Sequence, residues 1–223
     1  MFLLDFLAFE CTEKLDLCKQ KSTAGNIAEA AEGVAKMYDW IQLERICNEC
    51  RKCDLCEKRH NVVFGVGNRK ADIMFIGEGP GEQEDLKGVP FVGPAGKLLD
   101  DMLSIIDLDR NKCYIANIVK CRPPQNRDPS EEEQDACIEY LRNQVALIQP
   151  KIIVCLGRIA ARKIIEHDYR ITRDHGTWID RNGIWMTSIY HPSALLRDLS
   201  KRPDTFEDLL SIRKKAISLG INI

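Results

Sequence analysis

Four short apolar runs limit the fold of this chain more than any other feature of its sequence. The runs are Ala71–Gly77, Cys113–Val119, Ile152–Gly157 and Ile184–His191. Helical patterns at Gly96–Ile106, Ser130–Ile148 and Arg158–Glu166 follow the first three runs, and Asp204–Leu219 forms a closing helix. Strands that alternate with helices predict a mostly parallel sheet with helices on both faces. We therefore expect a three-layer α/β/α fold around a central four-stranded, mostly parallel sheet.

The chain is interpreted as two parts. Residues 1–45 form an N-terminal extension, and residues 46–223 form the α/β domain. Apolar residues from Ile27 to Ile46 recur at helical spacing, and Asn26 is a candidate N-cap. We therefore expect a helix at Ile27–Ile46 that packs on the main domain.

Composition and charge exclude some classes of protein. The chain has 30% charged residues and no apolar run long enough to span a membrane, and its apolar start, Met1–Phe9, is too short for a signal peptide and carries Asp5. We expect a cytoplasmic protein without membrane contact. The net charge of -2 gives no overall indication of nucleic-acid binding. From Lys151 to Arg173, however, six basic residues stand against two acidic ones, which suits either phosphate contacts or a solvated helix face.

A glycine-rich turn, Gly77–Asp85, follows the first apolar run. Its glycines let the backbone approach a ligand closely, at the strand ends where open α/β sheets bind ligands. The carboxylates of Glu78, Glu84 and Asp85 argue against a triphosphate, and no Lys-Ser or Lys-Thr follows as in a P-loop. The turn suits a small neutral ring, or it is an ordinary Gly-Pro loop.

Ten cysteines are many for a cytosolic chain of this length, where disulfides are disfavoured. Four form a C-x2-C-x2-C-x2-C run, and two stand far from it: Cys47, Cys50, Cys53 and Cys56, then Cys121 and Cys137. The run is similar to ferredoxin spacing and also fits zinc, so both kinds of site stay open. We interpret Cys113 and Cys155, on predicted strands, as small buried hydrophobes.

The fourth apolar run ends at His191, which Pro192 and Ser193 follow. A histidine at the carboxyl end of a strand lies where α/β active sites collect, although a lone histidine is more often structural. The hydroxyl and N–H of Ser193 suit a phosphate. Leu195 and Leu196 either face the core or insert into a DNA base stack.

These motifs together resemble the family 4 uracil-DNA glycosylases, the iron–sulfur type found in archaea and thermophilic bacteria. The matching stretches are Cys50-x2-Cys53, Val62–Gly65, Gly77–Gly81 with Glu84 and Asp85, Pro90–Gly93, Asn117–Arg127, Cys137 and His191–Ser193. The resemblance covers about residues 46 to 217 and leaves residues 1–45 outside it.

The resemblance implies a [4Fe–4S] cluster. Its ligands would be Cys50, Cys53, Cys121 and Cys137. Cys47 and Cys56 depart from the family pattern, and Cys47 could replace a ligand in register. The implied role is structural: the cluster would tie the cysteine run to the Cys121–Cys137 segment and shape a surface that faces DNA.

The resemblance also implies a mechanism. Uracil is flipped out of the DNA into a pocket, whose lining is formed by the backbone of Glu78, Gly79 and Pro80. Phe91 would stack on the flipped ring, and Asn117 would pair with uracil O4 and N3–H. His191 would donate a hydrogen bond to O2 as the glycosidic bond breaks.

The remaining roles are assigned with alternatives. The candidates for positioning the attacking water are Glu78, Glu84, Asp85 and Asn126. Ser193, Leu195 and Arg197 are the expected DNA contacts. We expect a monomer that acts on uracil-containing DNA, single- or double-stranded. The alternatives are a superfamily relative that acts on other deaminated bases, and an iron–sulfur DNA-binding accessory protein without catalysis.

Overall fold

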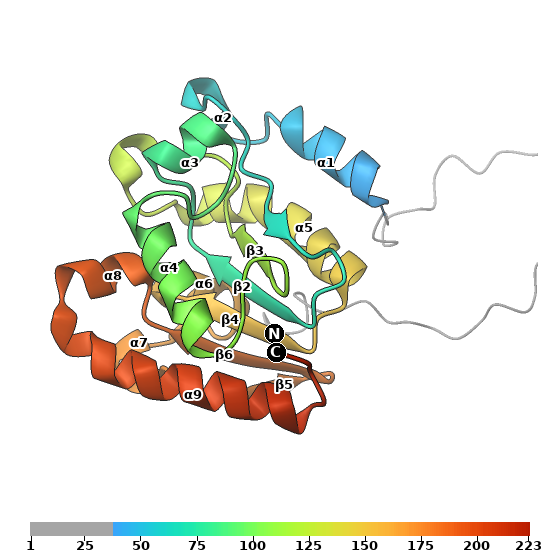
Figure 1. The fold of residues 1–223 in the computed structure, drawn as a ribbon. Helices are drawn as coiled ribbons and strands as arrows, with labels where there is room; N and C mark the ends of the chain where they lie inside the picture. The colour runs from blue at the N-terminus through green and yellow to red at the C-terminus, as the bar shows by residue number, and fades with distance from the viewer. Residues whose placement is uncertain (1–37) are drawn as a thin grey trace, which may run out of the picture.

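Alternating side chains in the strands divide the core between two layers of helices. The computed structural model describes residues 38–223. In β2 (Ile73–Gly77), Ile73 and Phe75 pack into one apolar cluster, whereas Met74 and Ile76 pack into another on the opposite face. The first cluster lies under α4 (Pro94–Ile105) and α9 (Arg202–Ser218), in front of the sheet in Figure 1. The expected three layers are confirmed.

The sheet has six strands within the described residues, in the order β1-β3-β2-β4-β6-β5. The strands other than β2 are β1 (Val66–Gly67), β3 (Tyr114–Asn117), β4 (Ile152–Leu156), β5 (Ile179–Arg181) and β6 (Ile184–Ile189). Neighbours are parallel from β3 through β2 and β4 to β6, and β1 and β5 are antiparallel edges. The four predicted strands therefore form the parallel centre, but the expected strand number was too small. The edge strands are only two and three residues long, too short for a clear alternating pattern.

The second helix layer covers the opposite face of the sheet. It contains α1 (Trp40–Asn48), α5 (Glu131–Ile148) and α6 (Arg158–Ile164), whose buried side chains join Met74 and Ile76. The remaining elements are α2 (Leu55–Lys58), α3 (Glu82–Lys87), α7 (Ile171–Asp174) and α8 (Pro192–Arg197), with 3-10 turns η1 (Pro124–Asn126) and η2 (Leu199–Lys201). The predicted capping box of α5 is confirmed: Glu133 N–H donates to Ser130 Oγ (3.2 Å), and Ser130 N–H donates to a Glu133 carboxylate oxygen (2.8 Å).

The predicted helix at Ile27–Ile46 is confirmed from Trp40 to Ile46, which lie in α1 (Trp40–Asn48), and is wrong at residues 38 and 39. Asp39 has extended backbone (φ -75°, ψ 171°) and caps α1, which begins at Trp40. The preceding part of that helix and its cap at Asn26 lie outside the described residues. α1 crosses the expected boundary between residues 45 and 46 and contributes Leu43 and Cys47 to the core, so the division into extension and domain stays a prediction.

No helix among residues 38–223 is both long enough and apolar enough to cross a membrane.

Candidate active site

A cavity of about 480 Å³ opens at the carboxyl ends of the parallel strands. Each of the four central strands contributes to it. The lining includes Glu78 to Gly81 after β2, Asn117 at the end of β3, Gly157 and Arg158 after β4, and Tyr190 and His191 after β6. The position is the one where open α/β sheets bind ligands.

Asn117 and Phe91 meet above the last residue of β2. Their side chains are almost fully buried, at 2% and 6% exposure, and both line the cavity. A Cβ atom on Gly77 would lie 2.5 Å from Asn117 Oδ1 and 2.6 Å from Phe91 Cζ, so only glycine leaves room for both. Asn117 Oδ1 is buried and has no hydrogen-bond partner among the described residues. Such an atom costs about 1–3 kcal/mol unless a ligand satisfies it.

Glu84 holds the loop that carries Phe91. One of its carboxylate oxygens accepts hydrogen bonds from the backbone N–H groups of Val92 and Gly93, both at 2.8 Å. Glu84 also lines the cavity. Glu84 lies in α3, which begins directly after Gly81. The second half of the predicted glycine-rich turn is therefore a short helix rather than a loop.

His191 is fixed as a hydrogen-bond donor to the cavity. It caps α8, and its Nδ1 accepts the Ser193 N–H (3.1 Å) and lies 2.8 Å from Ser193 Oγ. Since Nδ1 is an acceptor, the neutral ring carries its proton on Nε2. Burial, with the nearby charge of Arg197, lowers the pKa of His191 to about 4, so the ring is neutral at pH 7. The His191 ring lies beside Phe91, with centroids 5.6 Å apart.

Glu78 faces a second carboxylate that the sequence did not single out. Burial, and next the proximity of Asp128, raise the pKa of Glu78 to about 7, while Arg158 and Arg197 oppose the rise. Asp128 in turn binds the Arg158 guanidinium, and all of these side chains line the cavity. One signal for Arg158 was present in the sequence, because it directly follows a predicted strand end, as His191 does.

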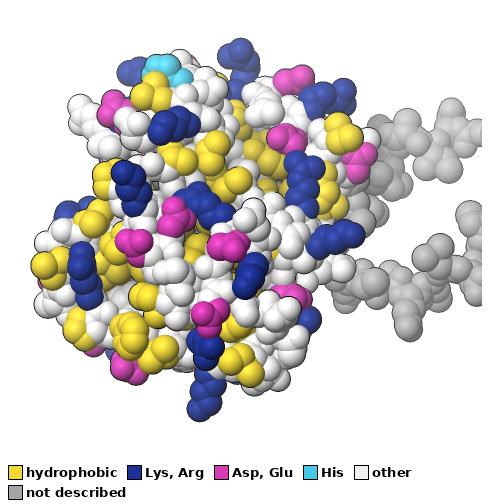
Figure 2. Space-filling model, in the orientation of Figure 1, with side chains coloured by type: hydrophobic (Ala, Val, Ile, Leu, Met, Phe, Trp, Pro, Cys, Tyr) yellow, Lys and Arg dark blue, Asp and Glu magenta, His cyan; other side chains and the backbone are white. Residues whose placement is uncertain are grey.

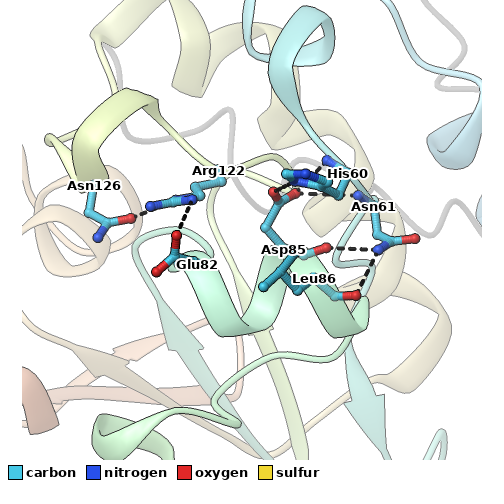
Figure 3. Close-up of polar contacts among 7 residues, drawn as sticks. All are labelled: His60, Asn61, Glu82, Asp85, Leu86, Arg122 and Asn126. Atoms are coloured by element: carbon cyan, nitrogen blue, oxygen red, sulfur yellow. Dashed lines mark hydrogen bonds and ion pairs between the residues drawn. The ribbon is translucent and has the colours of Figure 1, made fainter.

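Asn126 reaches the cavity from η1. Its Oδ1 accepts a hydrogen bond from Arg122 Nε (2.8 Å), and Arg122 Nη1 lies 3.6 Å from Glu82 (Figure 3). This contact connects the cavity lining to the first turn of α3.

Asp85 is not among the residues that line the cavity. Its buried carboxylate pairs with His60 Nδ1 (2.7 Å) and accepts the backbone N–H groups of His60 (2.9 Å) and Asn61 (3.3 Å) (Figure 3). The structure therefore separates Asp85 from Glu78, Glu84 and Asn126 and gives it a contact between α3 and the segment after the cysteines.

The expectation that Leu195 contacts DNA was wrong, because its side chain is buried. Leu195 is 2% exposed and packs in the core under α4 and α9, whereas Leu196 is 44% exposed. The two leucines share the short helix α8, whose start at Pro192 determines which of them faces inward. Ser193 and Arg197 line the cavity, and both the N–H and the hydroxyl of Ser193 contact His191.

The charged side chains around this part of the molecule are mixed in sign. Figure 2 shows Lys and Arg interspersed with Asp and Glu over the visible face, as the net charge near zero suggests. Basic side chains at the cavity itself are Arg127, Arg158, Arg197 and Lys201.

A second, small cavity lies among the cysteines. The residues that line it include Cys47, Cys50, Cys53, Cys56, Cys121 and Cys137. The cysteines predicted as cluster ligands are thus together, although two of them are 71 and 87 residues from Cys50 (121 − 50 and 137 − 50). Cys113 and Cys155 are fully buried elsewhere, as expected for structural cysteines.

The sulfur atoms of Cys121 and Cys137 each accept a hydrogen bond. Arg59 Nη1 donates to Cys121 Sγ (3.3 Å), and the backbone N–H of Lys120 donates to Cys137 Sγ (3.2 Å). Burial raises the pKa of the Cys137 thiol to about 12 and also raises the pKa of Cys53 and Cys121. Among residues 38–223, no three His, Cys, Asp or Glu side chains are arranged as the ligands of one metal ion.

Comparisons with known proteins agree with this geometry. The family model of the uracil DNA glycosylase superfamily matches residues 64–212. The type-4 uracil-DNA glycosylase of Archaeoglobus fulgidus is 49% identical over 174 residues, which are 74% of this chain and 85% of that protein. The type-4 enzyme of Sulfurisphaera tokodaii is 46% identical over 79% of this chain and 86% of that protein. The one from Saccharolobus solfataricus is 42% identical over 81% and 89%.

Proposed function

Because this chain belongs to the uracil-DNA glycosylase superfamily and to its type-4 members by similarity over most of its length, we propose that it removes uracil from DNA. The reaction is hydrolysis of the bond between uracil N1 and deoxyribose C1′. Its products are free uracil and an abasic site. The single observation that carries the proposal is the buried amide oxygen of Asn117, which has no hydrogen-bond partner in the described part of the chain and lines the same cavity as Phe91 and His191.

Asn117 reads the polar edge of the base. An amide offers one acceptor and one donor side by side, and uracil presents N3–H beside O4, so two hydrogen bonds form. The Oδ1 atom, which lacks a hydrogen-bond partner within residues 38–223, accepts from N3–H. Uracil thereby satisfies an atom whose burial is otherwise costly.

Phe91 and His191 act on the ring and on its leaving-group oxygen. The aromatic ring of Phe91 lines the cavity and offers a flat apolar face for the flipped base. As the glycosidic bond breaks, negative charge grows on uracil O2, and the Nε2–H of neutral His191 stabilises that charge. A neutral donor suits this role because no proton has to leave the ring.

Glu78 and Asn126 are the best supported candidates for positioning the water that attacks C1′. Both line the cavity, whereas Glu84 uses a carboxylate oxygen on the Phe91 loop and Asp85 lies away from the cavity. A carboxylate accepts the proton of an attacking water when it is ionised. Burial, and next the neighbouring Asp128, raise the pKa of Glu78 to about 7, so its charge depends on pH near neutrality.

DNA contacts are assigned to the rim of the cavity. Arg197 contacts a phosphate, whereas the N–H and the hydroxyl of Ser193, which was also an expected DNA contact, already bind His191 Nδ1. The wedge that enters the base stack is Leu196 rather than Leu195, because Leu196 is the exposed leucine of α8.

The cysteine cavity suits a [4Fe–4S] cluster held by Cys50, Cys53, Cys121 and Cys137. These four thiolates would each hold a separate iron atom, so they would not need to converge on one point as the ligands of a single zinc ion do. N–H donors to Cys121 and Cys137 are the outer contacts that stabilise ligated sulfur. When bound, the cluster supplies cross-links between the cysteine run and the segment from Cys121 to Cys137. Cys47 and Cys56 line the same cavity and are the alternative ligands.

An alkali-cleavage assay tests the proposed function. Labelled single-stranded oligonucleotides carry one uracil, cytosine, thymine or hypoxanthine at the same position. We expect a strand break at uracil alone. Cleavage at hypoxanthine instead would favour a relative that acts on other deaminated bases, and binding without cleavage would favour an accessory protein. Monomeric state and cytoplasmic location stay predictions from the sequence.

A further inference from the structure

Arg110, like Glu84, binds the backbone of the loop that carries Phe91. Its Nη1 donates to the carbonyl oxygen of Pro90 (3.0 Å), and its Nη2 donates to the carbonyl oxygen of Phe91. Its Nε donates to a carboxylate oxygen of Asp100 in α4 (2.6 Å). Arg110 therefore binds two successive carbonyl groups and an orienting carboxylate at once. It is not among the residues that line the active-site cavity.

The backbone of Phe91 needs such support. Its φ of 53° lies in the left-handed region, where a bulky side chain is rare and strained. Strain of this kind costs about 1–3 kcal/mol and persists only where the surroundings impose it. Because this conformation sets where the ring of Phe91 lies, the contacts that impose it also set the wall of the cavity.

The first turn of α4 adds a steric constraint. A Cβ atom on Gly96 would lie 1.8 Å from the carbonyl oxygen of Phe91, so only glycine lets this carbonyl lie against the helix. The carbonyl is thus fixed between Gly96 and the guanidinium of Arg110. Glu84 accepts the next two N–H groups of the loop.

The shape of the guanidinium matters. Its planar fork presents Nε–H and both terminal nitrogens in fixed directions, and three of them are used here. A lysine ammonium retains the charge but cannot hold two carbonyls and a carboxylate in one plane. Arg110 is only 25% exposed, so its bonds are less screened by solvent than those of a surface ion pair.

We propose that Arg110, oriented by Asp100, is a positioning residue that holds the ring of Phe91 where it stacks on the flipped base. The inference rests on the proposed function and deepens it by assigning a role to residues outside the cavity. Arg110 touches neither the base nor the DNA. Its effect on the reaction passes through Phe91 alone, and this restriction makes the proposal testable.

A double-mutant cycle between Arg110 and Phe91 is the test. We compare single-turnover uracil excision for the wild type, Arg110→Met, Phe91→Leu and the double variant. Arg110→Met is expected to slow excision about tenfold, which corresponds to about 1.4 kcal/mol, and to weaken inhibition by free uracil. In the Phe91→Leu background, which lacks the flat ring, the same change is expected to have an effect of less than about twofold. Affinity for abasic-site DNA, which has no base to stack, stays unchanged.

Arg213→Met is the matched control. Arg213 also donates two N–H groups to a carboxylate, that of Asp107, but neither of these bonds reaches the Phe91 loop. Arg213→Met should leave both excision and uracil inhibition unchanged. Arg110→Lys should behave like Arg110→Met if the fork geometry is what matters.

Two results overturn the proposal. One is an equal slowing of excision by Arg110→Met in the wild-type and Phe91→Leu backgrounds. The other is a loss of affinity for abasic-site DNA as well as for free uracil. Either result shows that Arg110 has a general structural role. If Arg110→Met does not fold, Asp100→Asn takes its place in the same cycle and tests the proposal. Asp100 is half-exposed, so its substitution is milder for the fold. A wild type that releases no uracil would instead contradict the proposed function itself.

Discussion

At the scale of single residues, the side-chain amide of Asn117 is the group that we propose to select the base. Asn117→Asp replaces the donor nitrogen by a carboxylate oxygen, which repels uracil O4. We expect uracil excision to fall by about two orders of magnitude or more, as in sites where a buried polar group loses its partner. The control is Asn68→Asp, because exposed Asn68 uses only its oxygen, as acceptor of the Lys70 N–H. Equal single-turnover rates for Asn117→Asp and wild type would remove Asn117 from this role.

The pH dependence of excision tests the role of Glu78. The carboxylate must be ionised to position water, and its pKa is raised to about 7. The rate should therefore rise as pH increases towards about 7 and level off above it. His191 does not contribute to this limb, because its pKa of about 4 leaves it neutral throughout.

Asp128→Asn refines the same prediction. Removal of the neighbouring carboxylate takes away a cause of the raised pKa of Glu78, so the acid limb should move to lower pH. Glu78→Gln should lower the excision rate at high pH and remove its rise with pH near neutrality. A limb near pH 7 that persists in Glu78→Gln would assign it to another group.

At the scale of elements, the short helix α8 buries Leu195 and exposes Leu196. Leu195→Ala should destabilise the fold by about 2–5 kcal/mol, since it leaves a cavity in the core. Leu196→Ala should change stability by less than about 0.5 kcal/mol, as exposed sites do. In excision assays Leu196→Ala should slow a U·A duplex much more than a single strand, because only the duplex has a pair to open. Thermal unfolding and paired kinetic assays distinguish these outcomes.

The elements also show what could be predicted from the sequence. Elements with long hydrophobic patterns and clear start signals were predicted well. These are the four central strands, and α5 with its capping box at Ser130. The edge strand β5 was missed, although Asn182-Gly183 before β6 is a hairpin signal and both residues have positive φ. The burial of Leu195 was not predictable, because a one-residue shift in the start of α8 would bury Leu196 and expose Leu195 instead.

The same contrast holds in the candidate site. His191 was predicted from the end of a strand, and such ends gather at one edge of a parallel sheet. Asn117 was assigned only through the family resemblance, because the predicted strand continued to Val119, whereas β3 ends at Asn117. Asp128 and Arg110 lie in loops whose contacts depend on tertiary packing, and no local pattern marks them. Asp85, adjacent to Glu84 in sequence, points away from the cavity because successive helical residues diverge by about 100°.

At the scale of the whole molecule, the cysteine cavity connects α1 and the cysteine run to β3 and α5. Cys121→Ser should lose iron, visible absorption and thermal stability together, because one ligand holds distant segments. Cys155→Ser, buried on β4 away from this cavity, should retain the iron. Metal analysis of anaerobically purified protein measures the iron content of both variants. Stoichiometric zinc without iron would contradict the cluster.

Release of the free base is the measurement that tests the central claim most directly. The wild-type protein is incubated with a single-stranded oligonucleotide that carries one uracil, and the small-molecule fraction and the remaining strand are weighed by mass spectrometry. The account predicts one free uracil for each strand and a strand whose mass is that of an abasic site. An intact strand after prolonged incubation with iron-loaded, folded protein would contradict it.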